Sequence, residues 1–164
     1  MTVGGSRSHM FMSSLDEVRA ILVFRYANPY DPSDYTAYQT EFARLVAAAR
    51  TARRQVVLVV DLEDGYPQPN AVQRKNIGEA WAKAPDVGGS IAIITSSVVI
   101  RGIITAIEWF MKNSPNRRET RAFARSDDAL AWLAEKSGIS RSDLTTVFEA
   151  ARPQRQRVAQ HASP

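Results

Sequence analysis

Two continuous apolar runs rich in β-branched residues constrain this chain most strongly: QVVLVVDL at 55–62 and SIAIITSS at 90–97. Because neither run alternates apolar and polar residues, each predicts a strand that is covered on both faces of a sheet. Apolar residues at helical spacing lie before, between and after the two runs, and they predict helices over 31–53, 70–84 and 98–113. Strands that alternate with helices in this way favour an α/β fold with a mostly parallel sheet.

Shorter elements complete the prediction at both ends of the chain. Strands at 11–14 and 19–26, joined by a polar turn, predict a hairpin that places the first strand antiparallel at one edge of the sheet. The remaining predicted elements are a half-buried strand at 119–126, a helix at 127–137 and a last helix at 141–152. The expected order is β-β-α-β-α-β-α-β-α with one extra C-terminal helix, around a mixed sheet of about five strands.

Residues at the helix ends support the C-terminal boundaries. Ser126 is placed to cap the helix that follows it, and Gly138 is placed to end that helix. Ser140, with Asp143 three residues later, has the pattern of a capping box. In the last helix Leu144, Val147 and Phe148 share one face, which must cover either the sheet or a second subunit, so a homodimer stays open.

The composition is that of a soluble globular protein, with 45% hydrophobic and 23% charged residues among 164. Cysteine is absent, which excludes disulfides, thiolate metal sites and thiol catalysis. No apolar run approaches the roughly 18 residues that a membrane-spanning helix needs, and no signal-peptide pattern is present, so we expect a cytoplasmic location. The only histidines, His9 and His161, lie in terminal segments, which argues against histidine-based catalysis or metal binding.

The net charge of +4 comes from the two ends of the chain. Without Arg7, Arg152, Arg155 and Arg157, 17 basic residues face 17 acidic ones. A nucleic-acid-binding domain normally carries its excess basic charge on the folded body, so we expect no nucleic acid to bind there.

One domain accounts for most of the chain. Residues 5–10, GSRSHM, resemble a cloning scar, and we expect 1–9 to be disordered. A single domain is predicted over 10–150, in which 139–150 form an appended helix, and 151–164 form a basic disordered tail.

The element order, together with the stretches IAIITSSVVIRGIITAIEWF and TRAFARSDDALAWLA, resembles the STAS domain, named for sulfate transporters and anti-sigma-factor antagonists. The similarity is to a diverged, largely bacterial branch and implies a SpoIIAA-like fold. In these stretches Val99 belongs to an apolar stripe that would face the sheet, and Gly102 would let its helix approach the sheet closely. Trp109, Phe110 and Trp132 are expected to fill the core.

The resemblance implies a non-catalytic module that docks on protein partners and takes part in signalling regulation. In regulatory members a serine or threonine after the third strand is phosphorylated, which switches docking, because phosphate suits a helix N-terminus. This chain departs from that pattern, since 52–89 contain no serine or threonine. The corresponding junction reads DLEDGYP at 61–67, where Tyr66 carries the only hydroxyl beside Glu63, Asp64 and Gly65.

The acidic residues of this junction allow a second interpretation. Asp61, Glu63 and Asp64 follow a buried strand, and carboxylates there could hold Mg²⁺, as in a receiver domain where Asp61 would accept the phosphoryl group. A receiver also needs acids after its first strand and a lysine after its fifth, and this chain offers Arg125 instead. Capping and turn formation explain the same acids, so we expect no metal and no cofactor.

A second strand-to-helix junction contains Ser96 and Ser97, with Arg101 one turn into the helix. Hydroxyls, amides and a guanidinium group could hold a small anionic or amphiphilic ligand there. Alternatively, one of the serines is the N-cap and Arg101 is a solvated side chain.

Arginines also gather after the first helix and near the last strand. Arg50, Arg53 and Arg54 could partner the helix dipole or form part of a docking patch. The second group could be the solvated face of a strand or part of such a patch; it consists of Arg117, Arg118, Arg121 and Arg125.

The sequence therefore predicts a cytoplasmic STAS-like interaction module that is not an enzyme. The tentative contact residues are Asp61, Glu63, Asp64, Gly65, Tyr66, Ser96, Ser97 and Arg101. A protein that binds a small or lipid-like ligand near Tyr66, Ser96, Ser97 and Arg101 is the alternative, and a receiver-like Mg²⁺-binding domain is the weaker one.

Overall fold

The structure is a computed structural model that describes residues 11–26, 32–62, 86–111 and 118–151, together with Val72, Lys75 and Glu79. Its strands are β1 (Phe11–Asp16), β2 (Ile21–Tyr26), β3 (Val56–Leu62), β4 (Gly89–Ile94) and β5 (Arg118–Phe123). Its helices are α1 (Pro32–Ala52), α3 (Val98–Met111), α4 (Ser126–Ser137) and α5 (Arg141–Ala150). The predicted α/β class is confirmed.

The five strands form one mixed sheet in the order β1-β2-β3-β4-β5, so their order in space follows their order along the chain. β1 pairs antiparallel with β2 at one edge, and every other neighbouring pair is parallel. The predicted mostly parallel sheet with an antiparallel N-terminal edge strand is therefore confirmed. In the β2–β3 register Arg25 lies opposite Asp61, a pairing that matters for the site described below.

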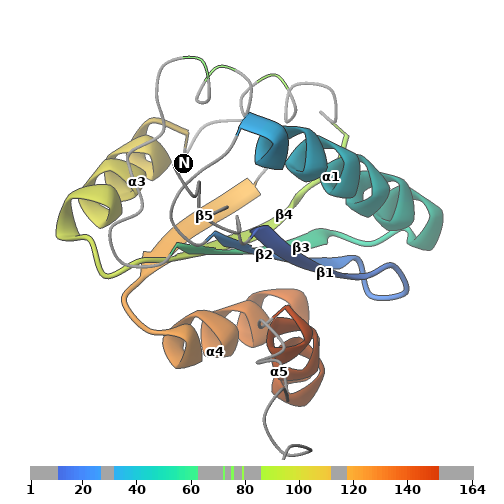
Figure 1. Ribbon diagram of the computed structural model, residues 1–164. Helices are drawn as coiled ribbons and strands as arrows, with labels where there is room; N and C mark the ends of the chain where they lie inside the picture. Colours follow the sequence, from blue (N-terminus) through green and yellow to red (C-terminus); the bar gives the residue numbers. More distant parts are fainter. Residues whose placement is uncertain are drawn as a thin grey trace, which may run out of the picture.

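Helices cover both faces of the sheet (Figure 1): α1 and α3 lie on one side, and α4 and α5 lie on the other. Two hydrophobic clusters fill the two interfaces. Under α1, Tyr38, Phe42 and Leu45 pack on Phe24 and Leu58 of the sheet. On the other face the α4–α5 cluster contains Ile21, Val23, Val57, Val59, Ala92, Leu130, Trp132, Leu133, Leu144, Val147 and Phe148.

The continuous apolar character of β3 follows from this arrangement. Val57 and Val59 enter the α4–α5 cluster, whereas Val56 and Leu58 enter the α1 cluster, because successive side chains of a strand point to opposite faces. All four are at most 2% exposed. The apolar face of α5 also packs on this sheet, against β1 and β2, so the chain itself covers the face for which a second subunit was the alternative.

Two of the predicted helix ends in the C-terminal region are confirmed, and one is wrong. Gly138 is the C-cap of α4 with φ of 70°, a conformation that glycine adopts without strain. Ser140 is the N-cap of α5, and its side chain accepts a hydrogen bond from the Asp143 amide at 3.1 Å. Ser126, in contrast, does not cap α4: the helix begins at Ser126 itself, and extended Arg125 occupies the N-cap position without a side-chain cap.

Two predictions for α3 are also wrong. Val99 is 60% exposed, so its side chain does not face the sheet. A Cβ atom at Gly102 would meet no described residue within 4 Å, so no described contact between helix and sheet requires this glycine. Trp132 is buried as predicted, whereas the side chains of Trp109 and Phe110 lie outside the described residues.

Other predictions fall wholly or partly outside the described residues. They include the scar and tail at the chain ends and most of the helix predicted over 70–84, although Val72, Lys75 and Glu79 within it are helical. No helix in the described part of the chain is both long and apolar enough to cross a membrane.

Candidate functional site at the carboxyl ends of the parallel strands

The candidate site lies where β2, β3 and β4 end, since both predicted junctions leave the sheet at this edge. There Asp61 forms an ion pair with Arg25 of the neighbouring strand, with 2.7 Å between Asp61 Oδ2 and Arg25 Nη2. The two side chains are only 18% and 16% exposed. The Arg25 guanidinium carbon also lies 4.4 Å from the centre of the Phe148 ring on α5. Asp61 thus helps to hold β2, β3 and α5 together.

This arrangement gives Asp61 a structural partner that the sequence did not suggest. An aspartate that binds Mg²⁺ or accepts a phosphoryl group must present its oxygens to an incoming group, whereas Arg25 already occupies one of them. Among the described residues, no group of three or more Asp, Glu or His side chains is arranged to hold a metal ion. The other junction residues, Glu63, Asp64, Gly65 and Tyr66, lie outside the described residues.

The Thr95–Ser97 junction is fixed by its own hydrogen bonds. The Thr95 hydroxyl accepts from the Ser97 amide at 3.2 Å, and the Ser97 hydroxyl accepts from the Ile100 amide at 3.3 Å. Ser97 is therefore the N-cap of α3, as one of the two interpretations of the serines expects. Arg101 is not simply solvated, because its Nη1 donates to the carbonyl oxygens of Thr95 and Ser96, each at 2.9 Å.

These contacts occupy several of the donors that an anionic ligand would need. The amides of Ser97 and Ile100 and one guanidinium nitrogen of Arg101 all donate to protein oxygens. The geometry is that of a rigid strand-to-helix turn, in which Arg101 fastens the first turn of α3 to the end of β4.

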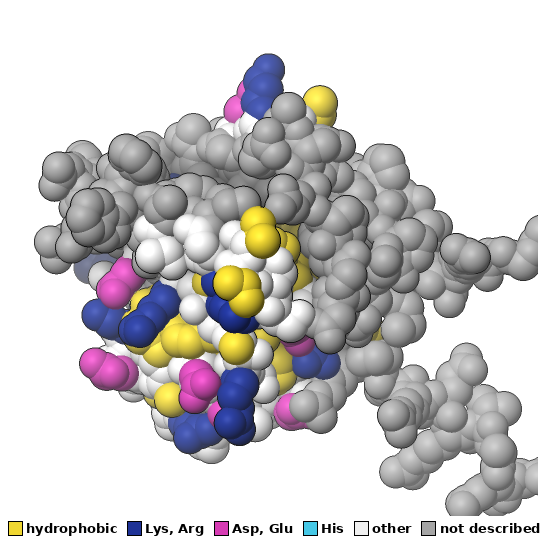
Figure 2. All heavy atoms as spheres, turned by 90° about the vertical axis from the view of Figure 1, so that its left-hand side faces the viewer, with side chains coloured by type: hydrophobic (Ala, Val, Ile, Leu, Met, Phe, Trp, Pro, Cys, Tyr) yellow, Lys and Arg dark blue, Asp and Glu magenta, His cyan; other side chains and the backbone are white. Residues whose placement is uncertain are grey.

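The rigid turn presents two apolar side chains to solvent. Val98 and Val99, the first two residues of α3, are 72% and 60% exposed. Figure 2 shows the molecule from this end: exposed hydrophobic side chains lie there among arginine or lysine and acidic side chains. The sequence did not reveal this feature, because apolar spacing predicts a helical stripe without showing which of its residues extend beyond the sheet.

The order of the strands bears on ligand binding at the same edge. Open α/β sheets usually bind ligands in a crevice where the strand order reverses and successive helices lie on opposite faces. The strand order of this sheet does not reverse, and the described helices that connect parallel strands, α1 and α3, lie on the same face (Figure 1). The described sheet therefore lacks the reversal of strand order that usually creates a ligand crevice at this edge.

Comparisons of the chain with family models, with curated proteins and with solved structures gave no match. A functional hypothesis for the chain therefore depends on the contacts of its own residues.

Proposed function

We propose that this chain is a non-catalytic protein-interaction module whose contact surface is the carboxyl end of the sheet. We call this surface the valine edge and define it by Val98 and Val99 with the adjoining turn of Ser96 and Ser97. The partner is a protein with a complementary apolar surface. A regulatory role follows from the same proposal, because a docking module acts by changing what its partner can contact.

The observation that carries the proposal is the exposure of Val98 and Val99, at 72% and 60%, on a turn held by four hydrogen bonds. Exposing two adjacent valines forgoes the stabilisation that burial gives, roughly 25 cal/mol for each Å² of apolar surface. A partner that covers them gains this free energy. Binding also costs this chain little conformational entropy, because the backbone beneath the two valines is already fixed.

The polar groups at this edge support docking rather than chemistry. Asp61 is paired with Arg25, and Arg101 is bound to two backbone carbonyls. Both residues fix the shape of the surface, so they serve as positioning residues in this proposal.

A distant relationship to the STAS domain is part of the proposal. Two features support it: the order of the elements, with an N-terminal antiparallel strand, and the position of the strand-to-helix junctions at one edge. In STAS proteins that regulate by docking, the junction after the third strand is the contact region. We extend this role to the junction that begins at Asp61.

The test compares two polar substitutions at opposite ends of the sheet. Val98→Ser/Val99→Ser removes the apolar groups of the valine edge, whereas Val18→Ser changes a side chain that is 75% exposed in the β1–β2 turn. Affinity purification from the source organism, with quantitative mass spectrometry, should recover specific partners with the wild type and with Val18→Ser. The valine-edge variant should lose them while keeping the wild-type melting temperature.

Retention of every partner by the valine-edge variant would place the docking surface elsewhere. Equal losses in the two variants would show that the capture depends on general surface hydrophobicity, and this outcome would also contradict the proposal.

A further inference from the structure

A half-open surface cavity of about 240 Å³ lies at the opposite end of the sheet from the valine edge, where β2 and β3 begin. Its lining residues come from three separate places in the chain, namely the β1–β2 turn, the α1–β3 link and the end of α4 with the link that follows. They are Arg19, Arg54, Gln55, Ser137 and Ile139. The volume is below the range of about 300–1,000 Å³ that is usual for drug-sized ligands, so the cavity suits a small molecule.

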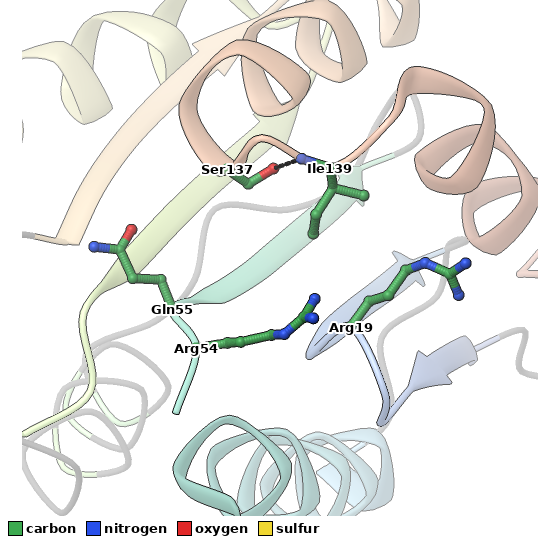
Figure 3. A pocket seen from close by; sticks show the side chains of 5 residues that line it. All are labelled: Arg19, Arg54, Gln55, Ser137 and Ile139. Atoms are coloured by element: carbon green, nitrogen blue, oxygen red, sulfur yellow. Dashed lines mark hydrogen bonds between the residues drawn. The ribbon is translucent and has the colours of Figure 1, made fainter. Parts of the chain in front are cut away.

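Arg19 is a fixed wall of this cavity. Its Nη1 lies 2.9 Å from Asp16 Oδ2, and its Nη2 lies 3.1 Å from Asp143 Oδ1. In Figure 3 its guanidinium group points away from Arg54. Two carboxylates thus face the single charge of Arg19, so these three groups together carry one net negative charge. The ion pair with Asp143 also ties the β1–β2 turn to α5.

Arg54 differs from Arg19 in having no carboxylate partner among the described residues. Its side chain extends into the space between Ile139 and Arg19, whereas the Gln55 side chain points the other way (Figure 3). The Ser137 hydroxyl donates to the Leu133 carbonyl at 2.7 Å and accepts from the Ile139 amide at 3.2 Å, so its hydrogen bonds are already made. The cavity thus combines one guanidinium group that pairs with no described carboxylate and the apolar side chain of Ile139.

We propose that this cavity binds a small organic carboxylate, with the carboxylate on Arg54 and the apolar body against Ile139. A guanidinium group presents two parallel N–H donors that match the two oxygens of a carboxylate. Because no described carboxylate pairs with Arg54, its N–H donors are available to an anion, and the apolar wall favours one with a hydrocarbon body over a bare inorganic ion. This inference goes beyond the proposed docking function and concerns the other end of the molecule.

The test uses benzoate and its uncharged analogue benzamide as probes, in a buffer of low ionic strength because salt screens an exposed charge. Chemical-shift changes of backbone amides in ¹⁵N-labelled protein report the position of binding. Benzoate should shift the amides of Gln55 and Ile139, and benzamide should not. Arg54→Gln should weaken benzoate binding by about fivefold, the scale of an exposed ion pair.

Arg53→Gln is the matched control, because Arg53 is adjacent, is exposed and does not line the cavity. It removes the same charge near the C-terminal end of α1 and should leave benzoate binding unchanged. Equal weakening in the two variants would reduce the effect to general electrostatics and overturn the proposal. Unchanged binding in Arg54→Gln, or equal shifts with benzamide, would overturn it as well. None of these outcomes depends on the valine edge.

Discussion

Arg25 and Asp61 lie opposite each other on neighbouring parallel strands, with 2.7 Å between their charged groups and with the Phe148 ring against the guanidinium. The pair connects the candidate site to the core on the α4–α5 side. Removing one partner of a largely buried ion pair strongly destabilises a fold, because the other charge stays buried and unpaired. Replacing both charges by apolar groups often leaves stability unchanged.

Asp61→Ala should therefore lower the free energy of unfolding by about 2–3 kcal/mol, because it leaves the mostly buried Arg25 without its ion-pair partner. The double variant Arg25→Met/Asp61→Leu should recover most of this loss. Chemical denaturation monitored by circular dichroism measures both values. A double variant less stable than Asp61→Ala would mean that the pair contributes more than its own desolvation cost.

Two glycine substitutions should have opposite effects. Gly102 lies in the interior of α3 with open space around its missing side chain, so Gly102→Ala should raise the free energy of unfolding by about 0.5–1 kcal/mol. At Gly89 a Cβ atom would clash with the backbone oxygen and side chain of Val56. Gly89→Ala should destabilise the protein by about 1–3 kcal/mol. Thermal melts of the two variants and the wild type show whether each substitution raises or lowers the melting temperature. A higher melting temperature for Gly89→Ala would contradict the close packing of β3 against β4.

Alanine substitutions can compare the starts of α4 and α5, where Ser126 does not cap its helix and Ser140 does. Ser140→Ala removes the side-chain cap on the Asp143 amide and should cost about 1 kcal/mol. Ser126→Ala removes no capping bond and should stay within about 0.5 kcal/mol of the wild type. If urea denaturation showed equal losses of unfolding free energy in the two variants, Ser126 would cap α4 after all.

Stability in acid should depend on Asp86. A side-chain hydrogen bond from Arg50 lowers the pKa of Asp86 from 3.8 to about 2. Because the folded-state pKa is the lower one, the stabilisation is complete above about pH 4 and is lost as the pH falls towards 2. Asp86→Asn should remove this part of the pH dependence. Arg50→Gln should remove the larger part of it, because a backbone hydrogen bond and Arg118 also lower the pKa of Asp86. The double variant should add nothing to the effect of Asp86→Asn. Unfolding curves recorded at several pH values between these limits provide the test.

Much of the fold could be predicted from the sequence because the strongest signals are periodic. β3 and β4 were predicted because strands buried on both faces cannot alternate, and α5 was predicted because its cap and its apolar face agree. Arg25 could not be identified as the partner of Asp61, since a continuous strand sequence gives no register. The exposure of Val99 was missed for a related reason: helical spacing identifies a stripe but not where the sheet beneath it ends. The sequence indicates Arg54 as a dipole partner or part of a docking patch but does not place it in a cavity, because the cavity forms when three distant segments meet.

The position of α4 and α5 has a consequence for the chain during synthesis. All five strands precede these helices, and each strand pairs with its neighbour in sequence, so the sheet can assemble progressively from the N-terminus. One of its faces, with Ile21, Val23, Val57 and Val59, stays uncovered until residues 126–151 emerge from the ribosome. A nascent or truncated chain that stops before them would expose an apolar β-surface of the kind that chaperones bind. The last two helices thus act as the layer that removes this face of the sheet from contact with other molecules.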